Sequence, residues 1–327
     1  MKLTRNSKIF INYLLGPLLF IWLTWSIYNQ IAAQPGLNQA WQQIIHTWGL
    51  QKIILLTATF ALMFLNWGLE AYKWMIAVKA VQQIPFMQAF QAIFSGVSFS
   101  VTTPNRMGEY LGRLMYVPEG SRLRTISGTI VGSMSQLIIT LLFGLIGLLF
   151  LQDRFISQEL IDQTWMKVII SGVSLVLTAM LLFYFRISWI VKLAGKLPQI
   201  KRIFYLLEAL EALNTASLLY LLMVSFFRFL VFSLQYYLFF YLFEVNIGIA
   251  DAFWSVNVSF LVMAVIPTIA IAELAQRGKV IITIAGLYSA NHLGITLATA
   301  AVWLVNLILP AIIGSILILG KRKIVSV

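Results

Sequence analysis

Two pairs of opposite charges recur at one spacing in an otherwise apolar sequence. Glu109 and Arg113 are four residues apart, and so are Glu273 and Arg277. The two glutamates differ by 164 in residue number, and so do the two arginines. Residues four apart lie on one face of a helix, so each pair could form an ion pair. Arginine can also bind phosphate, and glutamate can carry a proton.

The segments around these pairs also match each other. Residues 89–113 and 252–278 each begin Ala-Phe, run through apolar and hydroxyl residues to a proline, and then reach Glu-x-x-x-Arg. The prolines are Pro104 and Pro267, and each segment is too short and too broken to span a bilayer. Two broken segments in corresponding positions are typical of secondary transporters, whose binding site lies between two repeated halves.

The stretch around Pro104 has the features of an anion-binding helix start. Pro104 cannot continue a helix, and it pushes Thr103 toward an extended conformation. Asn105 is a good N-cap for a helix that restarts there, and its exposed amides, with Arg106 nearby, would attract an anion such as phosphate. The alternative is an ordinary helix start beside the membrane, with a surface ion pair worth about 0.3 kcal/mol.

Arg228 lies near the middle of a long apolar segment, where a charge is costly. Insertion scales put that cost at about 2.5 kcal/mol or more, so an arginine there predicts a functional site. Its expected partner is Glu109 or Glu273, and the alternative role is an ion pair that only locks the fold. Glu70 and Lys73, three residues apart in another apolar segment, are interpreted first as a pair at the membrane interface and second as a wall of the site.

The composition places these residues in a polytopic membrane protein. The 327-residue chain is 60% hydrophobic and only 10% charged, whereas soluble domains carry about 25% charged residues. The apolar runs are long and continuous rather than alternating, which favours α-helices over a β-barrel. The chain has no cysteine, which excludes disulfides and thiolate chemistry.

The expected fold is all-α, with about six full transmembrane helices. Each apolar run is near the ~20 residues that a bilayer requires. Residues 188–213 are basic and amphipathic, and they predict a connector at the membrane surface. The predicted spans are residues 9–31, 50–72, 125–151, 165–187, 215–243 and 291–320.

Basic residues predict the orientation of these spans. They gather before the first span, between residues 73 and 124, between residues 186 and 202, and after the last span. Because loops rich in Lys and Arg stay in the cytoplasm, both termini are predicted to be cytoplasmic in the inner (cytoplasmic) cell membrane. The net charge of +12 then faces anionic lipid, and no soluble basic domain is present to bind nucleic acid.

This orientation gives the two broken segments opposite directions of entry. Residues 85–117 are predicted to form a re-entrant helical hairpin from the cytoplasmic side, and residues 250–290 one from the outer side. Each half, residues 1–164 and 165–327, then holds three full spans and one hairpin, and the second half is an inverted-topology repeat of the first. The alternative is that both segments are ordinary short spans or interfacial helices.

Signatures of familiar enzymes and cofactors are absent from the sequence. His46 and His292 are far apart and show no metal-ligand spacing. The sequence contains no Gly-rich phosphate loop, no Ser-His-Asp motif and no paired-carboxylate signature. It therefore predicts no metal and no cofactor, and it favours a function other than catalysis.

The stretch PNRMGEYLGR carries a resemblance to a known family. Its residues Pro104, Arg106, Gly108, Glu109 and Arg113 resemble a motif of the lysylphosphatidylglycerol synthase transmembrane region, a family also described as flippase-like integral membrane proteins. The layout of the second copy and the final span is similar too. The family is usually Gly-rich before the second glutamate, whereas this chain reads Thr-Ile-Ala-Ile-Ala, so the chemistry of the outer hairpin is expected to differ.

The aminoacyl-lipid synthases of this family add a soluble aminoacyltransferase domain. This sequence ends at Val327, seven residues past its last predicted span, so we expect a stand-alone member that cannot make lysyl-lipid alone. The resemblance implies translocation of a polar-headed lipid between leaflets. Its expected partners are membrane lipids, with a lipid-linked or phospholipid substrate.

The expected function is that of a lipid flippase or transporter that works by alternating access. A head group containing phosphate would enter a polar cavity between the hairpins while its chains stay in lipid. The alternatives are a membrane-embedded enzyme with Glu109 as general base, a non-transporting scaffold for envelope-synthesis enzymes, and a carrier of small solutes. The candidate substrate-binding residues are Thr103, Asn105, Arg106, Glu109, Arg113, Arg228, Glu273 and Arg277.

Overall fold

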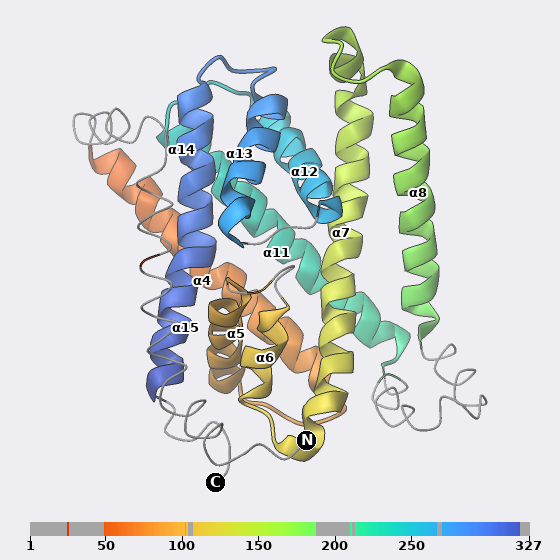
Figure 1. Ribbon diagram of the computed structural model, residues 1–327, viewed down its shortest axis with the longest axis vertical. Helices are drawn as coiled ribbons and strands as arrows, with labels where there is room; N and C mark the ends of the chain where they lie inside the picture. The colour runs from red at the N-terminus through yellow and green to blue at the C-terminus, as the bar shows by residue number, and fades with distance from the viewer. Residues whose placement is uncertain are drawn as a thin grey trace.

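The structure, a computed structural model, is all-helical over the residues that it describes. These are Trp25 and residues 49–101, 103, 107–187, 210, 213–266 and 270–320, with the backbone alone for residues 270–273 and 320. No β-strand occurs in these ranges, as the continuous apolar runs predict. Figure 1 shows long helices running between the two ends of the molecule, with shorter helices among them.

Five helical segments are long and apolar enough to cross a membrane. The shortest has 23 residues, and at about 1.5 Å per residue it exceeds the ~30 Å of a bilayer core. They confirm five of the six predicted spans, whereas the predicted span 9–31 and most of the connector 188–213 lie outside the described residues. The segments are α4 (Leu50–Val78), α7 (Arg122–Ser157), α8 (Gln163–Phe185), α11 (Thr215–Leu242), and the continuous run of α14 (His292–Trp303), the π-helix η4 (Leu304–Ile308) and α15 (Leu309–Gly320).

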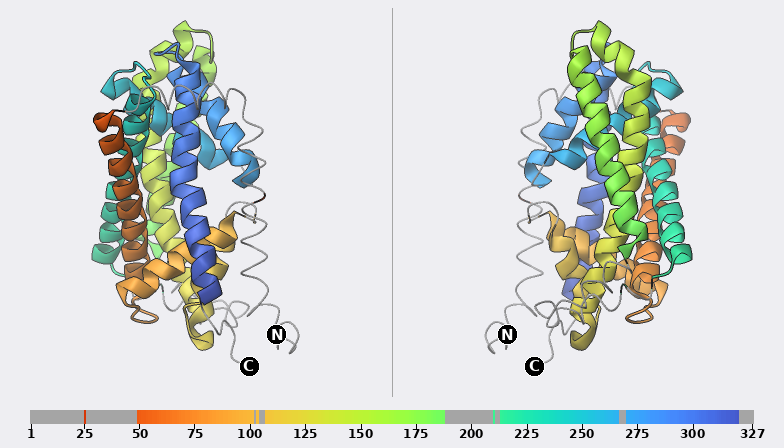
Figure 2. Two further views of the ribbon diagram at one scale, coloured as in Figure 1. Left: turned by 90° about the vertical axis from the view of Figure 1, so that its left-hand side faces the viewer. Right: turned by 90° about the vertical axis from the view of Figure 1, so that its right-hand side faces the viewer.

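Two pairs of shorter helices occupy the segments predicted as hairpins. The first pair is α5 (Phe86–Ser100) and α6 (Gly108–Leu114), and the second is α12 (Ile249–Val265) and α13 (Ala270–Ala285). The longest of the four has 17 residues, fewer than the ~20 that a span requires. Figures 1 and 2 place the first pair toward one end of the molecule and the second toward the other, with the tips of both pairs near mid-height.

Each short pair packs against a long helix from the other half of the sequence. α5 lies on α15, and α12 lies on α7. A Cβ atom added to Gly314 of α15 would lie 2.0 Å from the Phe94 carbonyl oxygen, and one added to Gly147 of α7 would lie 2.8 Å from Val258 Cγ2. Both contacts therefore depend on glycine, which lets helices approach closely in a membrane. Residue numbers 94 and 258 differ by 164, which is also the difference between Glu109 and Glu273.

The outer surface of the bundle is strongly apolar at α8. This helix packs only one side against α7 and α11, and it stands at the edge of the molecule in Figure 1. Trp165, Leu175 and Leu182 are 65%, 72% and 64% exposed. Such a surface is unfavourable in water and favourable against lipid chains. It therefore agrees with a helix that contacts the bilayer.

Candidate functional site

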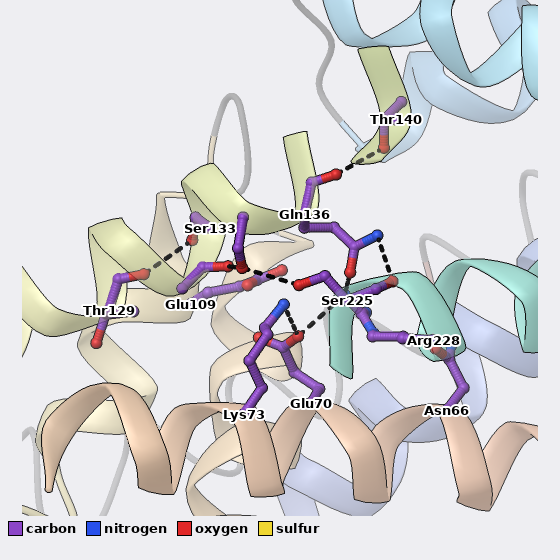
Figure 3. Close-up of polar contacts among 12 residues, drawn as sticks. Asn66, Glu70, Lys73, Glu109, Thr129, Ser133, Gln136, Thr140, Ser225 and Arg228 are labelled. Carbon is purple, nitrogen blue, oxygen red and sulfur yellow. Dashed lines mark hydrogen bonds and ion pairs between the residues drawn. The ribbon is translucent and has the colours of Figure 1, made fainter. Parts of the chain in front are cut away.

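A buried carboxylate on α4 holds three cations. Glu70 Oε1 lies 3.0 Å from Arg113 Nη2 of α6. Glu70 Oε2 lies 2.7 Å from Lys73 Nζ, one turn along α4, and 3.0 Å from Arg228 Nη1 of α11. Figure 3 shows Lys73 and Arg228 reaching Glu70 from opposite sides. Glu70 therefore joins three helices, α4, α6 and α11.

This charge cluster is almost entirely withdrawn from solvent. Glu70, Lys73 and Arg113 are 5%, 2% and 4% exposed. A lone charge at such a position is strongly unfavourable, and opposite charges in contact offset that penalty. Arg113 also donates a hydrogen bond to Glu109, whose carboxylate lies 3.0 Å away and is 23% exposed. The cluster thus combines three cations with two carboxylates, which leaves one net positive charge.

Two expectations about these residues need correction. Glu70 and Lys73 are not primarily an interface pair, because both side chains are buried inside the helix bundle. Arg228 finds its carboxylate in Glu70, whereas Glu109 pairs with Arg113. The Glu273 side chain lies outside the described residues. A signal for Glu70 was present in the sequence, because Asn66, Glu70 and Lys73 form a polar stripe at helical spacing on an apolar span.

Close helix packing brings Arg113 to this cluster. A Cβ atom added to Gly112 would lie 2.3 Å from the backbone nitrogen of Gly96, so α6 rests directly on α5. Thr103 Oγ1 accepts a hydrogen bond of 2.7 Å from the Gly108 amide at the start of α6. Thr103 therefore has a local structural contact. Its predicted neighbours in the site, Asn105 and Arg106, lie outside the described residues.

Arg228 is the residue of the cluster that also faces a cavity. Its Nη1 donates a hydrogen bond of 3.2 Å to Gln136 Oε1 of α7, and its guanidinium carbon lies 5.3 Å from the centre of the Trp67 ring. Its side chain is 19% exposed. Both of its polar contacts use Nη1, so the edge with Nε and Nη2 has no hydrogen-bond partner in the described structure.

The cavity beside Arg228 has a volume of about 490 Å³ and two kinds of wall. The helices that line it are α4, α7, α11, α12, α13 and the run from α14 into η4. The polar wall consists of Asn66, Gln136, Thr140, Arg228, Arg277 and Asn306, and the apolar wall includes Phe229, Phe232, Phe260, Met263, Val265 and Ile266.

A π-helix contributes one side of this cavity. Asn306 lies in η4, and its Oδ1 accepts a hydrogen bond of 3.3 Å from Asn66 Nδ2. Its own Nδ2 donates to the Val302 carbonyl at 3.2 Å. Single π-turns inside α-helices are rare and often occur at functional sites, because they aim a side chain that a regular helix would place elsewhere.

The structure brings some of the predicted site residues together and separates others. Arg228 and Arg277 line one cavity, although they belong to helices far apart in the sequence. Arg277 also donates from Nη1 to the Tyr236 hydroxyl at 3.5 Å. Arg113 and Glu109 lie instead in the buried cluster around Glu70. Arg228 connects the two groups, since it contacts Glu70 and lines the cavity.

Comparison with known proteins agrees with this architecture. A search of curated proteins found no match to the chain. The family model described as the lysylphosphatidylglycerol synthase TM region matches residues 9–317, which is nearly the whole sequence. The chain therefore belongs to the family of the lysylphosphatidylglycerol synthase transmembrane region, and it is a multi-pass membrane protein.

Proposed function

We propose that this protein moves a lipid with a phosphate-containing head group between the two leaflets of the cytoplasmic membrane. The observation that carries the proposal is the cavity of about 490 Å³, which joins Arg228 and Arg277 to an apolar wall. Arginine suits phosphate, and the apolar wall suits hydrocarbon. A cavity with both surfaces fits an amphiphile, and family membership supports a phospholipid as that amphiphile.

The apolar wall continues to the outside of the protein. Val265 and Ile266, at the end of α12, line the cavity and are 72% and 39% exposed. This end of α12 lies near mid-height of the molecule in Figure 1, which is the depth of lipid chains in a bilayer. The proposal therefore places the head group at the arginines and lets the chains leave sideways past α12. A carrier of small solutes would need these sides closed.

The proposed architecture consists of two inverted halves, residues 1–164 and 165–327. In it, α5–α6 enters the membrane from the cytoplasm, α12–α13 enters from outside, and both termini are cytoplasmic. The opposite placement of the two pairs supports this arrangement, and so does their reciprocal packing on α15 and α7. The concentration of basic residues in the loops assigned to the cytoplasm supports the direction.

In the proposed mechanism, alternating access comes from one half rocking against the other. The contact between Glu70 and Arg228 crosses the boundary between these halves, so rocking would change it. A phosphate bound at the other edge of Arg228 would share this guanidinium with Glu70. Binding of the lipid and movement of the halves would therefore be coupled through this one residue.

The test of the proposed function is lipid movement in reconstituted vesicles. Purified protein is incorporated into phospholipid vesicles that contain a trace of phosphatidylglycerol labelled with a fluorescent group on one chain. Dithionite added outside bleaches only the outer leaflet, so label that moves outward is lost in a second, slower phase. We expect this phase with protein and not in protein-free vesicles. Equal traces, or rapid uptake of water-soluble glycerol phosphate instead, would reject the proposal.

A further inference from the structure

We infer that the cavity selects lipids whose head group is anionic and bears hydroxyl groups, and that it rejects head groups that carry an amine. This inference rests on the proposed function and names the substrate class of the same site. It sets this chain apart from the lysine-bearing lipid in the name of its family.

The charge of the described lining favours an anion. Two guanidinium groups, those of Arg228 and Arg277, line the cavity, and none of its described lining residues is acidic. An ammonium group that entered this space would lie beside two like charges. Juxtaposed like charges are a common means by which binding sites reject wrong partners.

The carboxylate that contacts Arg228 is already shared by three cations. Glu70 already contacts Lys73, Arg113 and Arg228 through its two oxygens. The cluster around it carries one net positive charge, because Glu109 adds the only other described carboxylate that contacts it. A further cation there would increase an existing excess of positive charge.

The free edge of Arg228 has the geometry that an oxyanion requires. Gln136 and Glu70 are contacted by Nη1, and the edge with Nε and Nη2 has no partner in the described structure. Two parallel N–H groups on a planar guanidinium match two oxygens of a phosphate. The contact with Glu70 can therefore persist while the other edge binds the head group.

Most of the other buried polar atoms of the lining that have no hydrogen-bond partner are donors, so a ligand must supply acceptors to them. The indole N–H groups of Trp67 and Trp303 are buried and have no acceptor in the part of the chain that the structure describes. Phosphate and hydroxyl oxygens accept hydrogen bonds, whereas an ammonium group has donors only. Asn66 Oδ1 is buried without a donor and suits a hydroxyl hydrogen. Glycerol or sugar hydroxyls attached to phosphate would supply both functions.

Competition for binding to the full-length protein in neutral detergent tests this selectivity. The probe is fluorescent phosphatidylglycerol, and the competitors are dioctanoyl phosphatidylglycerol and dioctanoyl lysylphosphatidylglycerol. We expect the first competitor to displace the probe at a concentration at least about tenfold lower than the second. Arg228→Gln should reduce this preference to less than about threefold, because it removes one of the two cations that repel the amine. Arg277→Gln should reduce the preference by a similar factor. Because Arg277 lies outside the Glu70 cluster, this variant tests the inference even if Arg228→Gln does not fold.

Each contrary result points to a different error. Equal displacement by both lipids would overturn the inferred selectivity while leaving lipid transport possible. The inferred selectivity would also be overturned if both lipids displaced the probe equally from the wild type and the lysyl lipid no longer did so in Glu273→Gln. That result would show that Glu273 receives the amine. Failure of any lipid to bind the wild-type protein would overturn the selectivity and the proposed function together. Lys52→Gln, at an exposed ion pair with Glu244, serves as the matched charge control and should keep the preference.

Discussion

Glu70 Oε2 and Arg228 Nη1 lie 3.0 Å apart and join α4 to α11 beside a cavity that Arg228 also lines. Glu70 is 5% exposed, and the Arg228 side chain is 19% exposed. Glu70 thus lies within the buried cluster, and Arg228 lines the cavity as well; Figure 3 shows the two side chains in contact. The pair gives a physical reason for an arginine in the middle of an apolar helix, because its charge is compensated on one side and available on the other.

Removing the carboxylate of the cluster should destabilise the protein strongly. Glu70→Gln leaves Lys73, Arg113 and Arg228 close together without the acid that they share. Breaking a buried ion pair by removing one partner costs about 3–5 kcal/mol. We expect a large fall in the thermal unfolding temperature in detergent, together with a lower yield of folded protein.

A second substitution should recover part of that loss. In Glu70→Gln with Lys73→Met, one uncompensated cation is gone, so the double variant should unfold at a higher temperature than Glu70→Gln alone. The control is Glu244→Gln, which breaks an exposed ion pair with Lys52 and should cost about 0–1 kcal/mol. A double variant less stable than Glu70→Gln would show that Lys73 contributes by packing rather than by charge.

Substituting an arginine of the Glu70 cluster should mainly affect stability, and substituting an arginine of the cavity wall should mainly affect transport. Arg113 is 4% exposed and holds α6 to Glu70, so Arg113→Gln should lower stability by about 3 kcal/mol. Arg277 lines the cavity outside that cluster, so Arg277→Gln should lower the rate of lipid movement with a much smaller effect on unfolding. Unfolding curves and vesicle assays on both variants measure the two effects, and a reversed pattern would contradict the assignment.

Close packing at α15 should be intolerant of a single methyl group. In Gly314→Ala the new Cβ would lie 2.0 Å from the Phe94 carbonyl oxygen, so α5 and α15 must move apart. Overpacking of this kind costs about 1–3 kcal/mol. Gly172→Ala on α8 is the matched control, because no atom lies within 4 Å of its added Cβ. Thermal unfolding should show a loss for the first variant only, and equal behaviour would argue against the close contact.

Thiol labelling should place the two short helix pairs on opposite faces of the membrane. The chain has no native cysteine, so Gln83→Cys before α5 and Asn246→Cys before α12 give single reporters at exposed positions. A membrane-impermeant reagent should label Asn246→Cys in intact cells and Gln83→Cys only in inside-out vesicles. Labelling of both from the same face would reject the inverted architecture.

The spans and the short helix pairs could be predicted from the sequence because they depend on local properties. A run of about 20 apolar residues determines a span. Pro104 and the short length of residues 85–117 indicate a break, and α5 and α6 occupy that segment. Glu109 and Arg113, four residues apart, do form the ion pair that their spacing predicts. Arg113 is buried, however, and does not lie on the surface.

The contacts between helices that are far apart in the sequence could not be predicted in the same way. The contact of Glu70 with Arg228 exists because α4 packs along α11, and no local pattern specifies which two spans are neighbours. The π-helix that carries Asn306 also has no signature in the sequence. The cavity depends on both features, since Asn66, Arg228 and Asn306 line it together.

The most direct test of the central claim is the rate of lipid movement in vesicles that contain Arg228→Gln. Glu70 keeps Lys73 and Arg113 in this variant, so the protein should still fold, which its elution from a sizing column checks. A charge-assisted contact to phosphate is worth about 1.5–3 kcal/mol, so we predict a fall of at least about tenfold in rate. Lys52→Gln should stay within about twofold of the wild type, because its ion pair is exposed. A folded Arg228→Gln protein that moves lipid at the wild-type rate would contradict the account.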